Sequence, residues 1–413
     1  MIDLLLPEPL TWALRWLLLL GPLALLVVLV EWRKPAYRQQ VAAFFAFLYG
    51  ASMVFVTHSL AIWMGWWHYG WDSLMLNGIP ADILIGGAVL FGPVLYFAFP
   101  SASPLMMCLI IMVGLHGTMF TALKPLVEAG SNWPIGVAFV FATAHAPAIY
   151  LARWTERQSN LHFRAALLAI MYAGLALGIL PTLVMAAMGG FWALADHSLL
   201  DWLGLAGGLL VSFVIGLAGV QMLAVQGLGT AIPLDPTQRL VRTGIYAYVR
   251  NPMQLSAALS WVVLGLFLGN VWIMAAAIMA WVFVEGVVRW HHRHDLLQRF
   301  PEGWPEYRRD VPEWRPLWRP SFRVAARLSL NPNHLPDRLA ATLLRTVGAV
   351  DLDIRYGEGP ARYENPVDIQ PYRGPSALCM ALTHGNFATA LLGHASLLPT
   401  LPLQSLAWLE SGA

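Results

Sequence analysis

Long apolar runs separated by short polar segments dominate the first 290 residues of the chain. A helix needs about 20 mainly apolar residues to cross a bilayer. The last two runs are shorter and are joined by Leu268-Gly269-Asn270, which predicts a tight helical hairpin. The pattern predicts nine membrane-spanning helices, at residues 10–31, 41–64, 80–99, 105–121, 134–151, 165–188, 202–226, 254–269 and 271–288.

Composition supports this assignment. The chain has 413 residues, of which 58% are hydrophobic and 12% are charged, whereas soluble domains are roughly 45–50% apolar and about 25% charged. The first residues lack the basic start and cleavage site of a signal peptide, so we expect the first run to be a retained helix. The two cysteines, Cys108 and Cys379, cannot form a disulfide framework or a Cys/His zinc site, and no metal site is predicted.

The distribution of basic residues predicts the orientation. Loops near 65–79, 122–133 and 189–201 together carry only Lys124 of the Lys and Arg residues, and the segments after the first, fifth and seventh predicted helices each carry three arginines or lysines. By the positive-inside rule, the amino terminus is outside and everything from Arg289 onward is cytoplasmic. We expect an integral protein of a bacterial inner (plasma) membrane, in contact with the lipid bilayer. The basic residues follow the topology and form no patch, so no nucleic-acid partner is expected. The basic residues that set the predicted orientation are Arg33, Lys34, Arg38, Arg153, Arg157, Arg164, Arg239, Arg242 and Arg250.

The chain is expected to divide into three parts: a transmembrane bundle at 1–228, a polar loop, hairpin and tail at 229–320, and a small cytosolic α/β domain at 321–413. The Trp- and Arg-rich residues 289–320 suit the headgroup level of the membrane. The last part is predicted to contain a strand at Phe322–Leu330, helices at Pro336–Val347 and Ala377–Leu392, and a loop at Gly357–Pro371.

The segment Leu240–Pro252, LVRTGIYAYVRNP, is polar and punctuated by Gly and Pro between two apolar runs. Irregular backbone persists at a membrane edge when it lines a cavity or binds something. The segment resembles the isoprenylcysteine carboxyl methyltransferase and phospholipid methyltransferase family of integral membrane proteins. Gly244-Ile245-Tyr246 and Arg250–Gln254 match its Gly-Pro-Tyr and Arg-His-Pro-x-Tyr motifs, and Leu296–Phe300, Tyr307-Arg308 and Val311-Pro312 match its ending. The resemblance covers about 230–320.

This resemblance implies an enzyme that uses S-adenosylmethionine and methylates a lipid or prenyl-type acceptor entering from the bilayer. Methyl transfer of this kind depends mainly on positioning and on excluding water. The implied catalytic or acceptor-bordering residues are Arg250, Glu285, His292 and Arg293. The implied cofactor contacts are Gly244, Tyr246, Tyr248, Arg250, Asn251, Pro252, Gln254, Tyr307 and Arg308.

Several positions depart from the family pattern. Asn251 replaces the motif histidine, Gln254 replaces the motif tyrosine, and the acidic pair falls on His292 and Arg293, which leaves Glu285 as the carboxylate of that helix. An asparagine can still donate and accept hydrogen bonds. These departures motivate an alternative, a non-catalytic membrane scaffold or lipid-binding protein with a decayed pocket. Arg250 alone could equally be a positive-inside anchor paired with phosphate headgroups.

A second polar cluster precedes the third predicted helix. Trp66-Trp67-His68-Tyr69, followed by Gly78-Ile79-Pro80-Ala81-Asp82, resembles the small membrane-embedded lycopene cyclases, which use carboxylates to protonate a polyene. This implies a prenyl-lipid cyclase-like activity at Asp82. The alternative is an aromatic belt at the membrane interface followed by the start of a helix. At that helix start the negative charge of Asp82 interacts favourably with the helix dipole.

The carboxyl-terminal part resembles the end of DCC-type thiol-disulfide oxidoreductase-like domains, at Tyr372–Leu378, Leu391–Gly393 and Leu397–Pro399. At the place of that family's Cys-x-x-Cys stands Asn331–His334. A dithiol reaction needs two thiols, so the domain is expected to be redox-inactive. The expected fold class is an all-α polytopic membrane protein with about nine spans and a small cytosolic α/β, thioredoxin-like domain.

Overall fold

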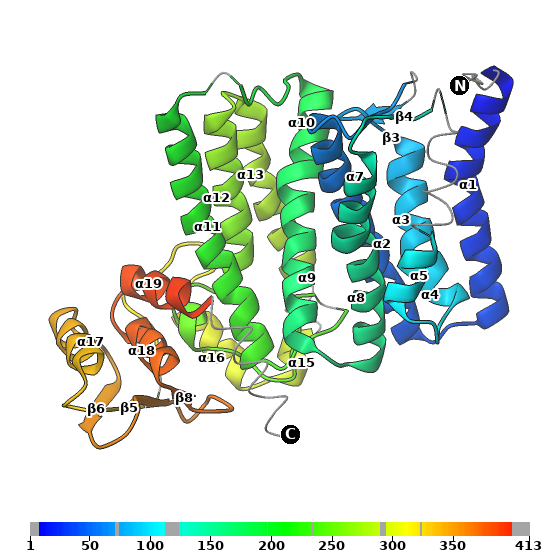
Figure 1. Ribbon diagram of the computed structural model, residues 1–413. Helices are drawn as coiled ribbons and strands as arrows, with labels where there is room; N and C mark the ends of the chain where they lie inside the picture. Colours follow the sequence, from blue (N-terminus) through cyan, green and yellow to red (C-terminus); the bar gives the residue numbers. More distant parts are fainter. Residues whose placement is uncertain are drawn as a thin grey trace. The chain divides into compact units, whose positions relative to one another are not determined.

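The computed structural model describes residues 8–70, 74–111, 124, 126–195, 197–232, 234–289, 295–322 and 324–398. Two compact units make up the chain, Met1–Phe191 and Trp192–Ala413 (Figure 1). The second unit begins before residue 228, because the last long apolar helix packs against the hairpin that follows it. The three-part division at 228 and 320 stays a prediction.

The first unit is a helical bundle around α2 (Tyr37–Trp63), which contacts α8 and α9 and has buried residues from Val41 to Ala61. Several of its helices contain π-helical turns, which loosen the regular ladder. Short strands β1 (Trp67–His68) and β4 (Glu128–Ala129) pair, as do β2 (Met75–Leu76) and β3 (Ile79–Pro80). The other elements are α1 (Glu8–Arg33), η1 (Asp82–Gly86), α3 (Gly87–Val89), η2 (Leu90–Val94), α4 (Leu95–Ala98), α5 (Pro104–Ile111), α7 (Trp133–Val140), η5 (Phe141–His145), α8 (Ala146–Arg157), α9 (Leu161–Gly174), η6 (Leu175–Ile179) and α10 (Leu180–Met188).

Among the described residues, five helices are long and apolar enough to cross a membrane, which confirms five predicted spans and supports an integral membrane protein. They are Leu10–Arg33, Tyr37–Trp63, Trp133–Arg157, Leu161–Met188 and Leu199–Val225. The predicted spans 80–99, 254–269 and 271–288 are shorter apolar helices. The predicted span 105–121 begins as α5, and its residues from 112 lie outside the described part of the chain. The count of nine is therefore not confirmed.

Helices α11 (Leu199–Val225) and α12 (Pro252–Phe267) pack antiparallel in the second unit along a seam of small residues. A Cβ placed on Gly219 would lie 2.8 Å from the Pro252 ring, and one on Gly216 would lie 2.6 Å from the Ser256 hydroxyl oxygen. The Ser256 hydroxyl donates to the Ser212 carbonyl across the seam at 2.6 Å. Close packing of small residues and interhelical hydrogen bonds hold helices together in lipid, where little hydrophobic force acts between them.

The tight joint predicted after α12 is confirmed. Gly269 has a left-handed φ of +60°, and the Asn270 side chain caps α13 (Val271–Phe283) by accepting from the backbone of Trp272 and Ile273. These two features stop one helix and start the next within three residues. Helix α13 therefore returns along α12 and continues into the π-helical turn η8 (Val284–Val288).

The carboxyl-terminal part confirms a small α/β domain with the strand order β6-β5-β7-β8, in which the β5–β6 pair is parallel and the other two pairs are antiparallel. Two details differ from expectation. The predicted loop contains β7, because the Tyr363 side chain is fully buried and draws its backbone into the sheet. The predicted helix 377–392 breaks at Gly385, after which Asn386 caps a new helix. Its elements are β5 (Ala326–Leu330), α17 (Leu335–Thr346), β6 (Leu352–Tyr356), β7 (Arg362–Glu364), β8 (Tyr372–Arg373), α18 (Pro375–Ala381), η10 (Leu382–His384) and α19 (Phe387–Leu397).

The segment expected at the headgroup level packs partly into the second unit instead. Helices α15 (Leu297–Arg299) and α16 (Gly303–Asp310) follow the hairpin, and the α16 side chains Trp304 and Tyr307 are only 5% and 4% exposed. They join a core cluster with Val241 and Ile245 of the polar loop. Trp304 and Tyr307 thus serve an internal contact, whereas Trp318 of the same segment is 65% exposed.

The seam between α11 and α12 generates a testable prediction. Gly219→Val should lower the free energy of unfolding in detergent by about 1–3 kcal/mol, because the added methyl groups overlap Pro252. Gly207→Val is the matched control, since a Cβ at Gly207 has open space around it on the same helix. Equal melting temperatures for the two variants would show that the seam is not tightly packed.

Candidate functional site

The polar loop between α11 and α12 is held by hydrogen bonds to residues that lie outside the loop. Its regular structure is limited to the short 3-10 turn η7 (Gly244–Ala247), so its backbone groups need partners elsewhere. Residues 312–321 supply them: the backbone of Arg250 donates to Pro312 at 3.0 Å, while Leu317 donates to the Tyr248 carbonyl at 3.0 Å and Ser321 to the Ala247 carbonyl at 2.9 Å. The loop and this later segment therefore form one layer.

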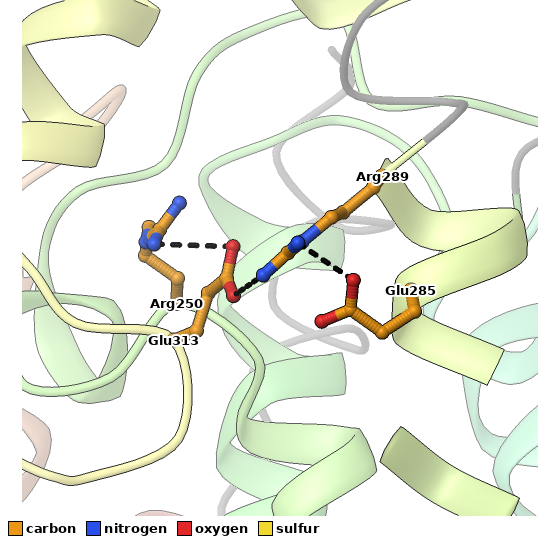
Figure 2. A network of polar contacts seen from close by, with 4 residues as sticks. All are labelled: Arg250, Glu285, Arg289 and Glu313. Carbon is orange, nitrogen blue, oxygen red and sulfur yellow. Dashed lines mark hydrogen bonds and ion pairs between the residues drawn. The ribbon is translucent and has the colours of Figure 1, made fainter. Parts of the chain in front are cut away.

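Arg250 lies at the end of a chain of ion pairs (Figure 2). Its guanidinium contacts the Glu313 carboxylate at 3.2 Å, Glu313 contacts Arg289 at 3.0 Å, and Arg289 contacts Glu285 at 2.6 Å. The Arg250 side chain is only 8% exposed. Burial lowers the pKa of its guanidinium, and the nearby Glu313 carboxylate offsets part of this shift.

A pocket of about 180 Å³ adjoins this network. Among the described residues, three arginines and one glutamate line it, and its walls are completed by apolar side chains. The Nε and Nη1 atoms of Arg250 and the Nδ2 atom of Asn251 are buried without a hydrogen-bond partner in the described part of the chain. Guanidinium groups are suited to binding carboxylate or phosphate, and the volume equals about six water molecules, enough for an anionic headgroup. The lining residues are Arg250, Arg289, Leu297, Trp304, Pro305, Arg308 and Glu313.

The structure brings Arg250, Glu285 and Arg308 together, as the resemblance implies, through the network and the pocket. Asn251 precedes α12 and its carbonyl accepts from Leu255 at 3.0 Å, with Pro252 at the first helical position. Gln254 lies half-buried in the same turn. The implied residues His292 and Arg293 lie outside the described part of the chain.

Other implied cofactor contacts face the protein interior. The Tyr248 side chain is fully buried, and its hydroxyl donates to the Thr383 carbonyl at 2.8 Å. The Tyr307 hydroxyl donates to the Tyr246 carbonyl at 2.8 Å, and both side chains are buried. Gly244 has a φ of +61°, and a Cβ there would lie 2.8 Å from the Met222 sulfur. These contacts hold the loop in place, which is at odds with a direct cofactor contact by Tyr248.

Two members of the network, Glu313 and Arg289, are not among the site residues that the sequence predicts. Arg289 follows Glu285 by four residues, a spacing that places both on one face of a helix, and this signal was available. Glu313 directly follows the Val311-Pro312 motif. Its contact with Arg250 spans more than sixty residues of sequence, so no local pattern indicates it.

A larger cavity of about 660 Å³ lies on the other face of α16. Its walls are loop residues 238–243, the α16 residues Gly303, Tyr307 and Asp310, and residues 365–368 of the α/β domain. Its size falls in the range of about 300–1,000 Å³ typical of small-molecule sites. The Asp368 carboxylate accepts from the Thr243 hydroxyl at 3.0 Å, and its Oδ2 atom is buried without a hydrogen-bond partner among the described residues. The pKa of Asp368 is raised to about 7. Burial is the main cause of the rise, and Thr243 and Arg239 oppose it.

Asp82 forms an ion pair within the first unit. Its carboxylate pairs with the Arg15 guanidinium at 3.0 Å, and both side chains are less than 10% exposed. Charged residues inside membrane segments commonly pair in this way. A general acid must carry a proton to donate, whereas this carboxylate is placed to neutralise Arg15. The contact argues against a cyclase-like role for Asp82.

Residues 202–294 match the family model of the phospholipid methyltransferases. The match includes most of α11, the polar loop, the hairpin and the network residues Arg250, Glu285 and Arg289. It therefore supports a membrane methyltransferase enzyme with lipid or prenyl methyltransferase activity. Neither a curated protein nor a solved structure matches the chain. Glu313 and the α/β domain lie beyond the matched residues.

The raised pKa of Asp368 predicts how stability depends on pH. A carboxyl group whose folded pKa exceeds its ordinary value of 3.8 stabilises the fold below that value, and the stabilisation is lost as pH rises through about 7. Asp368→Asn should therefore melt at a higher temperature than the wild type at pH 8, with a smaller difference at pH 5. The Thr243 hydroxyl can still donate to the asparagine oxygen.

The control for this measurement is Asp353→Asn, which changes a half-exposed carboxylate on β6. Its melting temperature relative to the wild type should stay nearly constant across the same pH range. A difference between Asp368→Asn and the wild type that does not vary with pH would contradict the burial of a titrating carboxyl group at this position.

Proposed function

We propose that this chain is an integral membrane methyltransferase that uses S-adenosylmethionine and acts on a lipid or prenyl-type acceptor. The observation that carries the proposal is the coincidence of two features. The residues that match the phospholipid methyltransferase model include Arg250, and Arg250 is a buried cation with unpaired donor atoms at a small pocket.

The residues at the pocket fit the carboxylate end of the cofactor. S-adenosylmethionine carries a carboxylate and, when bound, supplies a methyl group on a sulfonium centre. Arg250 and Arg308 would hold that carboxylate. The amide of Asn251, which follows Arg250 in the chain and is buried, would donate a further hydrogen bond. Gln254, in the next helical turn, would border the same region. Since Asn251 retains a donor, its substitution for histidine preserves this function.

The network residues would position the arginines. Glu313 contacts Arg250 and Arg289 at once, and Glu285 contacts Arg289 from the opposite side, so each carboxylate limits where the guanidinium groups point (Figure 2). Fixed orientation and exclusion of water lower the barrier to methyl transfer. The buried Trp304 side chain closes one wall of the pocket. We further propose that His292 and Arg293, which follow Arg289 in the chain, border the acceptor.

The same proposal places the pocket and the α/β domain on the cytoplasmic side of a bacterial inner membrane, with the amino terminus outside. The clustering of Arg239, Arg242, Arg250 and Arg289 after apolar helices supports this orientation. We also propose that the α/β domain is a redox-inactive, DCC-like scaffold of thioredoxin-like type. The parallel β5–β6 pair and the antiparallel β7 and β8 support that topology.

The cofactor site predicts measurable binding. Purified protein in detergent should bind S-adenosylmethionine with a micromolar dissociation constant in calorimetry, and Arg250→Ala should weaken binding at least about tenfold, because a charged hydrogen bond contributes about 1.5–3 kcal/mol. Arg355→Ala is the control, since Arg355 is an exposed arginine on β6. Its affinity should equal that of the wild type.

Transfer of a labelled methyl group to extracted membrane lipids would then identify the acceptor class. Label in a phospholipid headgroup or in a prenyl-linked carboxylate supports the proposed activity. Absence of binding at millimolar S-adenosylmethionine would refute it. The chain would then be better described as a membrane scaffold or lipid-binding protein that has the architecture of the family without its reaction.

A further inference from the structure

The polar loop that carries Arg250 is fastened to the α/β domain, which lies beyond the residues that match the family model. We propose that this domain is a positioning element for Arg250, acting through Tyr248 and Thr243. The expected effect on cofactor binding rests on the proposed function. The attachment of the loop to the domain rests on contacts within the second unit.

The first contact is centred on Tyr248, two residues before Arg250. Its hydroxyl donates to the Thr383 carbonyl, and its ring lies 5.6 Å from the ring of Phe387 on α19. Its own carbonyl accepts from Leu317, and the Phe387 backbone donates to the neighbouring Trp318 carbonyl at 2.9 Å. Tyr248 is therefore bonded both to the segment after α16 and to the turn between α18 and α19.

The second contact lies at the start of the loop. The Thr243 hydroxyl donates to Asp368, as described above. Close by, the Gln226 side chain at the end of α11 donates to the Tyr372 hydroxyl and accepts from the Ile369 backbone, each at 2.9 Å. Residues 368–372 thus bind both the helix end and the first part of the loop.

A close approach links the two contacts. Gly244 has a left-handed backbone, and a Cβ there would lie 3.1 Å from the ring of His394, which is fully buried on α19. The turn η7 therefore packs directly against α19, between Thr243 and Tyr248. Only glycine combines this φ with this proximity.

These contacts fix the position of the loop and thereby the position of Arg250. The loop lacks a hydrogen-bonded ladder of its own, so each external bond that is removed leaves loop residues less restrained. Tyr248→Phe removes one hydroxyl and leaves the Thr383 carbonyl without that donor. The charge of Arg250 and its pairing with Glu313 remain possible in the variant. In the variant the Arg250 side chain is held less firmly in its orientation toward the pocket.

The first test uses the full-length chain in detergent. Tyr248→Phe and Thr243→Val should each increase amide hydrogen exchange across residues 243–250 and increase the rate of tryptic cleavage after Arg250 by about fivefold to tenfold, the change expected for one lost hydrogen bond. Tyr356→Phe is the matched control, because it removes the hydroxyl of an exposed tyrosine that accepts from Arg345 within the same domain. Exchange across 243–250 should not change in the control.

The second test asks whether the effect reaches the cofactor site through Arg250. Tyr248→Phe should weaken binding of S-adenosylhomocysteine about fivefold in calorimetry. In an Arg250→Lys background the same substitution should cost much less, since two residues that act through one contact are not additive. A purely global loss of stability would give equal losses in both backgrounds.

The outcomes separate this inference from the proposed function. Unchanged exchange across 243–250 in both Tyr248→Phe and Thr243→Val would overturn the positioning role. Increased exchange with unchanged S-adenosylhomocysteine affinity would also overturn it, because Arg250 would then be positioned without the domain. If the wild type binds no S-adenosylhomocysteine, the proposed function fails, and the exchange and cleavage rates alone decide whether the domain holds the loop.

Discussion

The second unit depends on one constraint: an irregular polar loop at the end of an apolar helix must satisfy its backbone groups without a ladder of its own. Residues 312–321 bond to the loop along one side, and the α/β domain bonds to it through Thr383 and Asp368. The tail after the hairpin is therefore part of the framework of the loop. Removing it would leave the carbonyls of Ala247 and Tyr248 without their partners.

The same framework makes a buried arginine tolerable. Arg250 is nearly inaccessible to solvent, and the alternating order of Arg250, Glu313, Arg289 and Glu285 balances the charges along the network. A buried cation whose remaining donors are unpaired is costly unless something binds there. This cost is the physical reason to consider the pocket a binding site, and it is independent of the family match.

The first unit uses its charges differently. The ion pair of Arg15 and Asp82 joins α1 to η1 within an apolar bundle. An acidic residue entering an apolar helix invites a functional interpretation on sequence alone. Its partner, sixty-seven positions earlier in the chain, makes a structural role the better account.

The sequence by itself determined five membrane helices, the hairpin joint at Gly269 and Asn270, the polar loop and the presence of a small α/β domain, because hydrophobic length and local capping are properties of neighbouring residues. The resemblance of its motifs to those of the methyltransferase family also implied Arg250, Glu285 and Arg308 as candidates. Only the tertiary structure paired Arg250 with Glu313, Asp82 with Arg15 and Tyr248 with Thr383. Each of these contacts joins residues more than sixty positions apart, and such contacts depend on how the elements pack, which no local pattern specifies.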